Sequence, residues 1–100
     1  MNYRHGDLLI REIKKLPKNL KKKAGNILAE GEATGHHHQL VAEKLQLLED
    51  SKGRLYFKVE KPSPLTHQEH KTITVEPGVY VVEREREYDY ALESIKRVID

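Results

Sequence analysis

The sequence contains no cysteine and no tryptophan, and it has one methionine and one phenylalanine. Without cysteine there is no disulfide framework and no thiolate metal ligand, so apolar packing must hold the core together. No apolar run approaches the roughly 18 residues that cross a bilayer, and the N-terminus lacks the hydrophobic stretch of a signal peptide. We therefore expect a cytoplasmic protein without membrane contacts.

What the chain does contain indicates a polar globular domain. It has 100 residues, of which 37% are hydrophobic and 34% charged. Leucine, isoleucine and valine recur along the whole length, which distinguishes the composition from that of a disordered chain. A chain of this length is one domain, so we expect residues 1–100 to fold around a single core.

Positive charge is concentrated near the N-terminus. Residues 1–25 hold eight Lys and Arg against Asp7 and Glu12, whereas the rest of the chain is net acidic. We expect residues 14–25 to form a basic loop, which could attract the phosphates of a nucleic acid. The alternative is a solvated loop, because the segment lacks the aromatic residues on which bases stack. The lysines concerned are Lys14, Lys15, Lys18, Lys21, Lys22 and Lys23.

Short apolar runs separated by turn residues predict a mainly β fold. We expect a small β barrel or sandwich of about six strands, with a short C-terminal helix over residues 88–99. A hairpin with a Pro77-Gly78 turn is expected over residues 72–82. The segments expected as strands are residues 6–13, 27–29, 45–49, 54–59, 72–75 and 79–82.

Two segments need a choice between structures. Residues 39–49 contain good helix formers, whereas the Asp50-Ser51-Lys52-Gly53 turn and the run Leu55–Val59 suit a hairpin over residues 45–59, and propensity alone leaves both structures open. Residues 61–64 contain two prolines, which cannot donate to a ladder, so we expect the strand to end there and a loop to follow.

Four histidines in two short clusters are the main candidates for chemistry. His36 and His38 are two residues apart, so on a strand they share a face while His37 points away. His67 and His70 are three residues apart, and a helical turn or tight loop would place both on one side. If the fold joins the clusters, they can form a site with four imidazoles.

Such a site would suit a transition metal. Zinc is the first expectation, with iron or nickel as alternatives, because imidazole is a ligand that all three accept. Glu69 could serve as a ligand or as the general base, and Glu32 or Glu43 could orient a ring. The alternatives are a polar cleft without metal and ordinary surface histidines near turns.

A weak resemblance to the first cupin metal motif concerns His36, His38 and Glu43, and Pro77-Gly78 resembles the glycine turn of the second. The second motif's histidine is missing, with Tyr80 nearby, and a regular strand would turn Glu43 away from the two histidines.

A more extensive resemblance is to a family of small uncharacterised bacterial and phage-associated proteins. The segments that carry it are Gly6–Leu9, Ile27–His38, Leu65–His70, Pro77–Val82 and Arg86–Asp89. Family members have patterns similar to Gly-Glu-x-Thr-Gly-His-x-His and Leu-Thr-His-x-Glu-His. The resemblance implies that the motif positions are His36, His38, His67, Glu69 and His70, and it favours the hairpin over residues 45–59. It implies no reaction.

The sequence thus predicts a metal-binding domain, with His36, His38, His67 and His70 as ligands. An open coordination position would activate water for hydrolysis, with Glu69 or Glu43 as base. A closed shell would instead hold the two halves of the core together. The alternative from another class is a module that binds nucleic acid or protein through residues 14–23.

Overall fold

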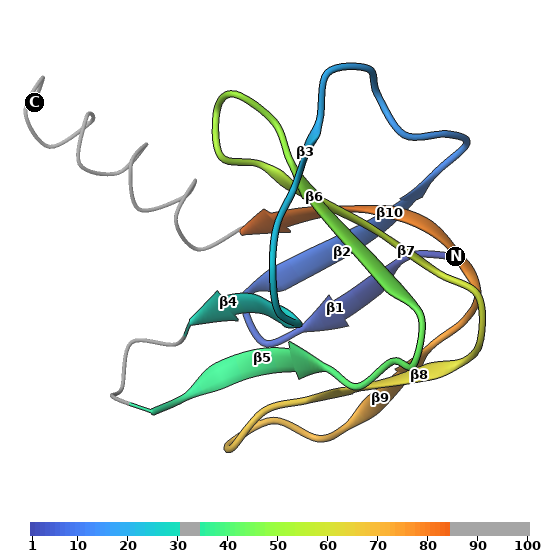
Figure 1. The fold of residues 1–100 in the computed structure, drawn as a ribbon. Helices are drawn as coiled ribbons and strands as arrows, with labels where there is room; N and C mark the ends of the chain where they lie inside the picture. The colour runs from blue at the N-terminus through green and yellow to red at the C-terminus, as the bar shows by residue number, and fades with distance from the viewer. Residues whose placement is uncertain (31–34, 85–100) are drawn as a thin grey trace, which may run out of the picture.

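The described residues form two antiparallel sheets. The computed structural model describes residues 1–30 and 35–84, which contain ten strands (Figure 1). Six strands form one sheet in the order β1-β2-β10-β7-β6-β3, and four form the other in the order β4-β5-β8-β9. The strands are β1 Tyr3–His5, β2 Leu8–Ile13, β3 Lys21–Lys22, β4 Ile27–Glu30, β5 His37–Leu40, β6 Leu45–Glu49, β7 Leu55–Val59, β8 Ser63–Thr66, β9 Ile73–Val75 and β10 Gly78–Arg84.

The mainly β class is confirmed, whereas the expected number of about six strands was wrong, and of the two expected architectures the closed barrel is not observed in the described residues. Ten strands replace the expected six because β1, β3, β5 and β8 are short and lack a strong apolar signal. Neither sheet closes on itself, since each has two end strands. The helix expected over residues 88–99 lies outside the described residues. The described part contains no apolar helix of the length that a bilayer crossing requires.

The hairpin expected over residues 45–59 is confirmed. β6 and β7 pair antiparallel, with Leu45 opposite Val59 and Glu49 opposite Leu55. Asp50 closes the turn, because its Oδ1 accepts hydrogen bonds from the backbone N–H groups of Lys52 and Arg54, both at 2.9 Å. These bonds lower the pKa of the Asp50 carboxyl, the one from Arg54 most strongly.

The hairpin expected around Pro77-Gly78 was wrong, although both of its arms are strands. β9 pairs with β8 in the four-stranded sheet, whereas β10 pairs with β2 and β7 in the other. The turn therefore carries the chain from one sheet to the other. Apolar residues on β10 favour the centre of the larger sheet, because there they are covered on both faces.

The loop expected after Val59 also contains a strand. Pro64 lies in β8 opposite Thr74, and its carbonyl accepts a hydrogen bond from the N–H of Val41 at 2.8 Å. A proline is accommodated where the ladder needs its carbonyl rather than its nitrogen. β8 thus joins β5 to β9, and the residues after it begin the second histidine cluster.

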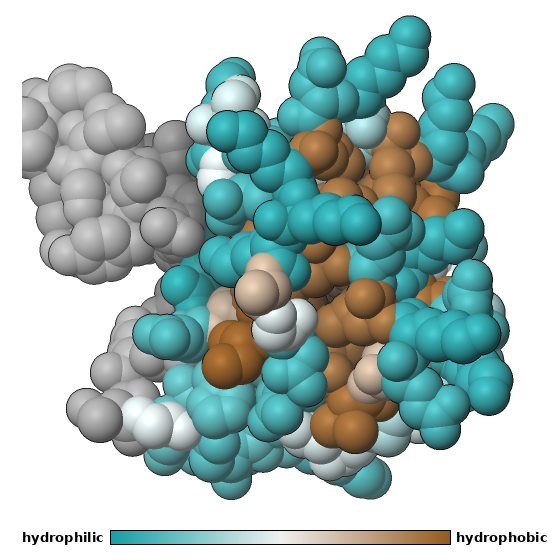
Figure 2. Space-filling view, viewed as in Figure 1, coloured by the Kyte–Doolittle hydropathy of each residue, from teal (hydrophilic) through white to brown (hydrophobic). Residues whose placement is uncertain are grey.

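One core fills the space between the sheets. It draws residues from both, and Phe57 of β7 stacks on Tyr80 of β10 with ring centroids 5.0 Å apart. Burial of these side chains is the main source of stability in a domain without disulfides. Figure 2 shows hydrophobic residues reaching one face between hydrophilic ones. The core residues are Leu8, Ile10, Leu28, Leu40, Leu47, Phe57, Val59, Leu65, Val75, Tyr80 and Val82.

A smaller apolar cluster lies on the other face of the large sheet. Leu48, Tyr56 and Val81 form it, and Leu16 and Leu20 of the basic segment pack against it. These contacts anchor the segment, so its leucines face the sheet. Its six lysines are all exposed.

Candidate functional site

The strand β5 determines which histidines of the first cluster point inward. Burial alternates along it: His38 and Leu40 are buried, whereas His37 and Gln39 are half-buried. The ring of His37 lies beside Gln39, with 3.3 Å between its Nε2 and the amide Oε1. The expected separation of His37 from His38 is therefore observed, and His38 is 1% exposed.

The second cluster follows β8 and is fastened to β5. β5 and β8 pair with Gln39 opposite Thr66, which places the following residues beside the first cluster. The side-chain oxygen of Gln68 accepts a hydrogen bond from the backbone N–H of His37 at 2.8 Å. The Nδ1 of His67 accepts one from the N–H of Glu69 at 3.0 Å. The loop is thus a tight turn rather than a helical one.

The fold brings the two clusters together. The ring centroid of His67 lies 4.4 Å from that of His38, 5.8 Å from that of His36 and 4.6 Å from that of His70. The His38 and His70 rings are 5.9 Å apart and nearly parallel. The expected meeting of the clusters is therefore confirmed as geometry, while their role as ligands stays a prediction.

A fifth histidine, His5, completes the group and was missed by the sequence analysis. Its ring lies 5.0, 6.3 and 5.8 Å from those of His38, His67 and His70. Each of these four rings is therefore within 6.3 Å of the other three, and His36 stands at the edge. The β1–β2 turn, the start of β5 and the β8–β9 connection lie at one end of the molecule (Figure 1).

The turn that follows His5 also shapes the site. Gly6 has a φ of 63°, and β1 pairs with β2 across the two-residue loop Gly6-Asp7. A Cβ at position 6 would lie 2.5 Å from Nε2 of His70. Glycine is needed here both for the left-handed backbone and for the close approach of that ring. The His5-Gly6-Asp7 sequence was the available signal: a histidine and a carboxylate flanking a turn glycine.

Hydrogen bonds connect His5 and His38 within the buried part of the site. Their Nδ1 atoms are 2.9 Å apart, and the Nε2 of His5 is 2.9 Å from the carbonyl oxygen of Lys71. On its other side, the Nε2 of His38 is 3.6 Å from Oδ1 of Asp7. The second oxygen of Asp7 is 3.3 Å from Nε of Arg84.

The environment favours neutral imidazoles. The pKa of His38 is lowered to about 4, mainly by burial and then by the neighbouring His67 and His5, while Asp7 opposes the shift. Burial also lowers the pKa of His67, followed by the effects of His70, His36 and His5. Burial lowers the pKa of His5, and the hydrogen bond to the backbone of Lys71 partly offsets this by raising it. Near pH 7 these three rings carry no charge, as a metal ligand requires.

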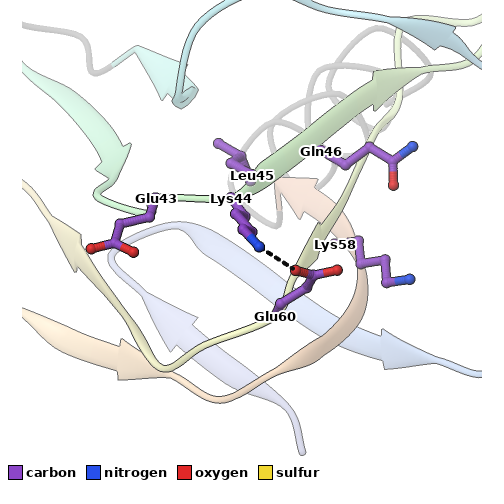
Figure 3. Close-up of a pocket in the computed structure, with 6 residues that line it drawn as sticks. All are labelled: Glu43, Lys44, Leu45, Gln46, Lys58 and Glu60. Carbon is purple, nitrogen blue, oxygen red and sulfur yellow. Dashed lines mark ion pairs between the residues drawn. The ribbon is translucent and has the colours of Figure 1, made fainter.

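The candidate carboxylates differ in position. Glu69 lies with its Oε1 3.4 Å from Nδ1 of His36, so it borders the cluster. Glu43 lies elsewhere: its carboxylate is 3.4 Å from Nζ of Lys61, and Figure 3 shows it at the rim of a separate pocket of about 270 Å³. This pocket is lined by Glu43, Lys44, Leu45, Gln46, Lys58 and Glu60. The third candidate, Glu32, lies outside the described residues.

In residues 1–30 and 35–84, no three His, Asp or Glu side chains converge as they stand on one point that could hold a metal ion. The reason is visible in the contacts, because the rings face one another: His5 is hydrogen-bonded to His38 instead of sharing a centre with it. Coordination by the predicted ligands His36, His38, His67 and His70 would require the less buried rings to rotate. His36, which is 27% exposed, and the half-buried His67 and exposed His70 have room to do so.

The chain belongs to a family described as a domain of unknown function (DUF8820), whose model matches residues 4–85. The match covers His5, both histidine clusters, most of β1 and the whole of β2 to β10. It fits the resemblance to an uncharacterised family. Searches of curated proteins and of solved structures found no match.

Proposed function

We propose that this domain binds a transition-metal ion through His36, His38, His67 and His70. The observation that carries the proposal is the spacing of the imidazole rings. A ring nitrogen lies about 2.0–2.1 Å from zinc, which puts two ring centroids on a tetrahedral ion about 5 Å apart. Four pairs of the candidate rings have centroids between 4.4 and 5.9 Å apart: His38–His67, His67–His70, His36–His67 and His38–His70.

The chemistry of the donors supports the same proposal. Lowered pKa values keep His38 and His67 neutral at pH 7, so protons do not compete for their lone pairs. Imidazole suits zinc first, with iron and nickel as alternatives. Of the five histidine rings that lie close together, His5 and His38 are almost fully buried. Buried histidines have to be paired or bound.

Metal content after purification without an affinity tag tests the proposal. We expect about one equivalent of zinc, iron or nickel, and a thermal shift when zinc is added to the metal-free protein. Zinc at 100 times its Kd adds about 2.7 kcal/mol, which corresponds to a rise in Tm of roughly 10–20 °C for a domain of this size.

Two variants complete this test. The double variant His36→Ala/His67→Ala should lose the metal and the thermal shift. His37→Ala is the matched control, since its ring lies on the opposite face of β5 and should leave both unchanged. Less than about 0.1 equivalent of metal without any thermal shift, or full metal content in the double variant, would contradict the proposal.

The proposal has a catalytic form. A metal with an open position lowers the pKa of bound water, and Glu69 would accept its proton as general base. Its carboxylate borders His36 and is 65% exposed, so a substrate can reach it. We expect the zinc-loaded protein to hydrolyse p-nitrophenyl acetate or bis(p-nitrophenyl) phosphate. Glu69→Gln should reduce the rate about 10²- to 10⁴-fold while keeping the metal. Equal rates in the wild type and Glu69→Gln would refute the role of Glu69 as general base, and absence of hydrolysis in the zinc-loaded wild type would indicate a structural metal.

The second candidate function is the binding of a nucleic acid by the basic segment. The observation that favours it is the anchoring of Leu16 and Leu20 on the second apolar cluster, which presents the neighbouring lysines outward. Retention of DNA or RNA should fall steeply with salt and vanish in a Lys21→Glu/Lys22→Glu/Lys23→Glu variant. The His36→Ala/His67→Ala variant should bind nucleic acid as the wild type does. Retention that is unaffected by the three substitutions would refute this function.

A further inference from the structure

The hydrogen bonds of His5 determine which nitrogen of His38 is available for a ligand. The carbonyl of Lys71 can only accept, so the Nε2 of His5 carries the hydrogen of that 2.9 Å bond. The Nδ1 of neutral His5 then has a lone pair, and it must accept from the Nδ1–H of His38, 2.9 Å away. The Nε2 of neutral His38 is therefore an acceptor without hydrogen.

This nitrogen faces an oxygen that is also an acceptor. The Nε2 of His38 is 3.6 Å from Oδ1 of Asp7, which is beyond the usual range of 2.7–3.2 Å for a hydrogen bond. Two lone pairs at this distance repel unless a cation lies between them. Nitrogen and oxygen ligands on one tetrahedral zinc ion are about 3.4 Å apart. The observed spacing therefore fits two atoms that share a metal ion.

The carboxylate is held in the orientation that this arrangement needs. Asp7 follows the left-handed Gly6 in the β1–β2 turn, and its Oδ2 is 3.3 Å from Nε of Arg84 on β10. The arginine forms an ion pair with one oxygen of Asp7, and the other oxygen is turned to His38. His70 lies against the same turn, which places a further imidazole beside the pair.

We propose that Asp7 is an oxygen ligand of the metal, sharing the ion with Nε2 of His38, and that His5 is a positioning residue which holds His38 in the required tautomer. This inference rests on the proposed metal binding and extends it to a mixed nitrogen and oxygen site for a divalent ion of zinc type. His67 and His70 supply further imidazoles. His5 is not a ligand, because both of its ring nitrogens are engaged.

Nitrogen NMR of the imidazoles tests the positioning role in the metal-free protein, independently of metal binding. We expect His38 to be protonated at Nδ1 and bare at Nε2, and His5 to show the opposite tautomer. In His5→Leu the His38 ring should lose this single tautomer. In His5→Asn the amide oxygen can replace Nδ1 as acceptor, so the His38 ring should keep its single tautomer. A protonated Nε2 on His38 in the wild type would overturn the positioning role.

Zinc titration tests the ligand role of the carboxylate. Asp7→Asn and His5→Leu should each weaken zinc binding about 10- to 100-fold, whereas His5→Asn should stay near the wild type. The control is Glu60→Gln, a carboxylate on the far pocket that pairs with Lys44. Amide spectra establish that each variant is folded. Wild-type zinc affinity in Asp7→Asn would overturn the inference and leave the four-histidine proposal standing, whereas a wild type that binds no metal would overturn both.

Discussion

Acidification should destabilise this domain through His38, even without metal. The ring is 1% exposed and its pKa is about 4, against 6.5 in an unfolded chain. Burial disfavours the charged form most, followed by His67 and His5, while Asp7 favours it and His70 adds a smaller opposing effect. Between pH 6.5 and 4 the unfolded chain therefore binds more protons than the folded one, so stability is complete above 6.5 and is lost as the pH falls.

The size of the effect follows from the two pKa values. Linkage gives a loss of about 1.4 kcal/mol at pH 5.5 and about 3 kcal/mol at pH 4 as an upper value. A domain of this size has roughly 5–15 kcal/mol of stability, so the loss is a large fraction of the total. His5 and His67 shift in the same direction and add to the loss.

Urea unfolding of the metal-free protein between pH 7.5 and 4 measures this dependence. The comparison is with His38→Asn, which cannot titrate but keeps a donor where Nδ1 stands. The difference in unfolding free energy between the two proteins should shrink by about 3 kcal/mol over this range. A difference that stays constant with pH would show that His38 is not held neutral by its burial.

Two substitutions probe the turn and the core. Gly6→Ala should cost about 1–2 kcal/mol of stability because of the left-handed backbone, and it should also displace His70 and weaken zinc binding. Gly53 has a similar φ of 84° but open space around it, so Gly53→Ala should lose stability without a change in zinc binding. Equal zinc affinities in the two variants would contradict the role given to the Gly6 turn. Phe57→Ala should cost about 3–5 kcal/mol in urea unfolding, because the ring is fully buried against Tyr80, while the exposed Lys58→Ala should change stability by less than about 0.5 kcal/mol. A loss below 1 kcal/mol in Phe57→Ala would refute this packing.

Local patterns indicated several elements of the fold. For the β6–β7 hairpin, the Asp50–Gly53 turn signal suited a hairpin, but the helix formers of residues 39–49 left the choice open until the family resemblance favoured the hairpin. The pairing of β9 and β10 was not predictable, because a Pro-Gly turn is compatible with a hairpin and with a crossing between sheets. β8 was missed for a related reason: whether Pro64 breaks a strand depends on which neighbour uses its carbonyl.

The candidate site divides in the same way. Sequence spacing alone determined that His37 points away from His38, because side chains alternate along a strand. Only the tertiary structure decided that the two clusters meet, through the pairing of β5 with β8. It also brought His5 and Asp7 to the site. Both lie about 30 residues or more from the clusters in sequence, and they flank Gly6 in the β1–β2 turn beside the clusters. Residue type and local periodicity are properties of neighbours in the chain. A site shared by distant segments depends instead on sheet order and register, which are set when the apolar faces of those segments are buried together.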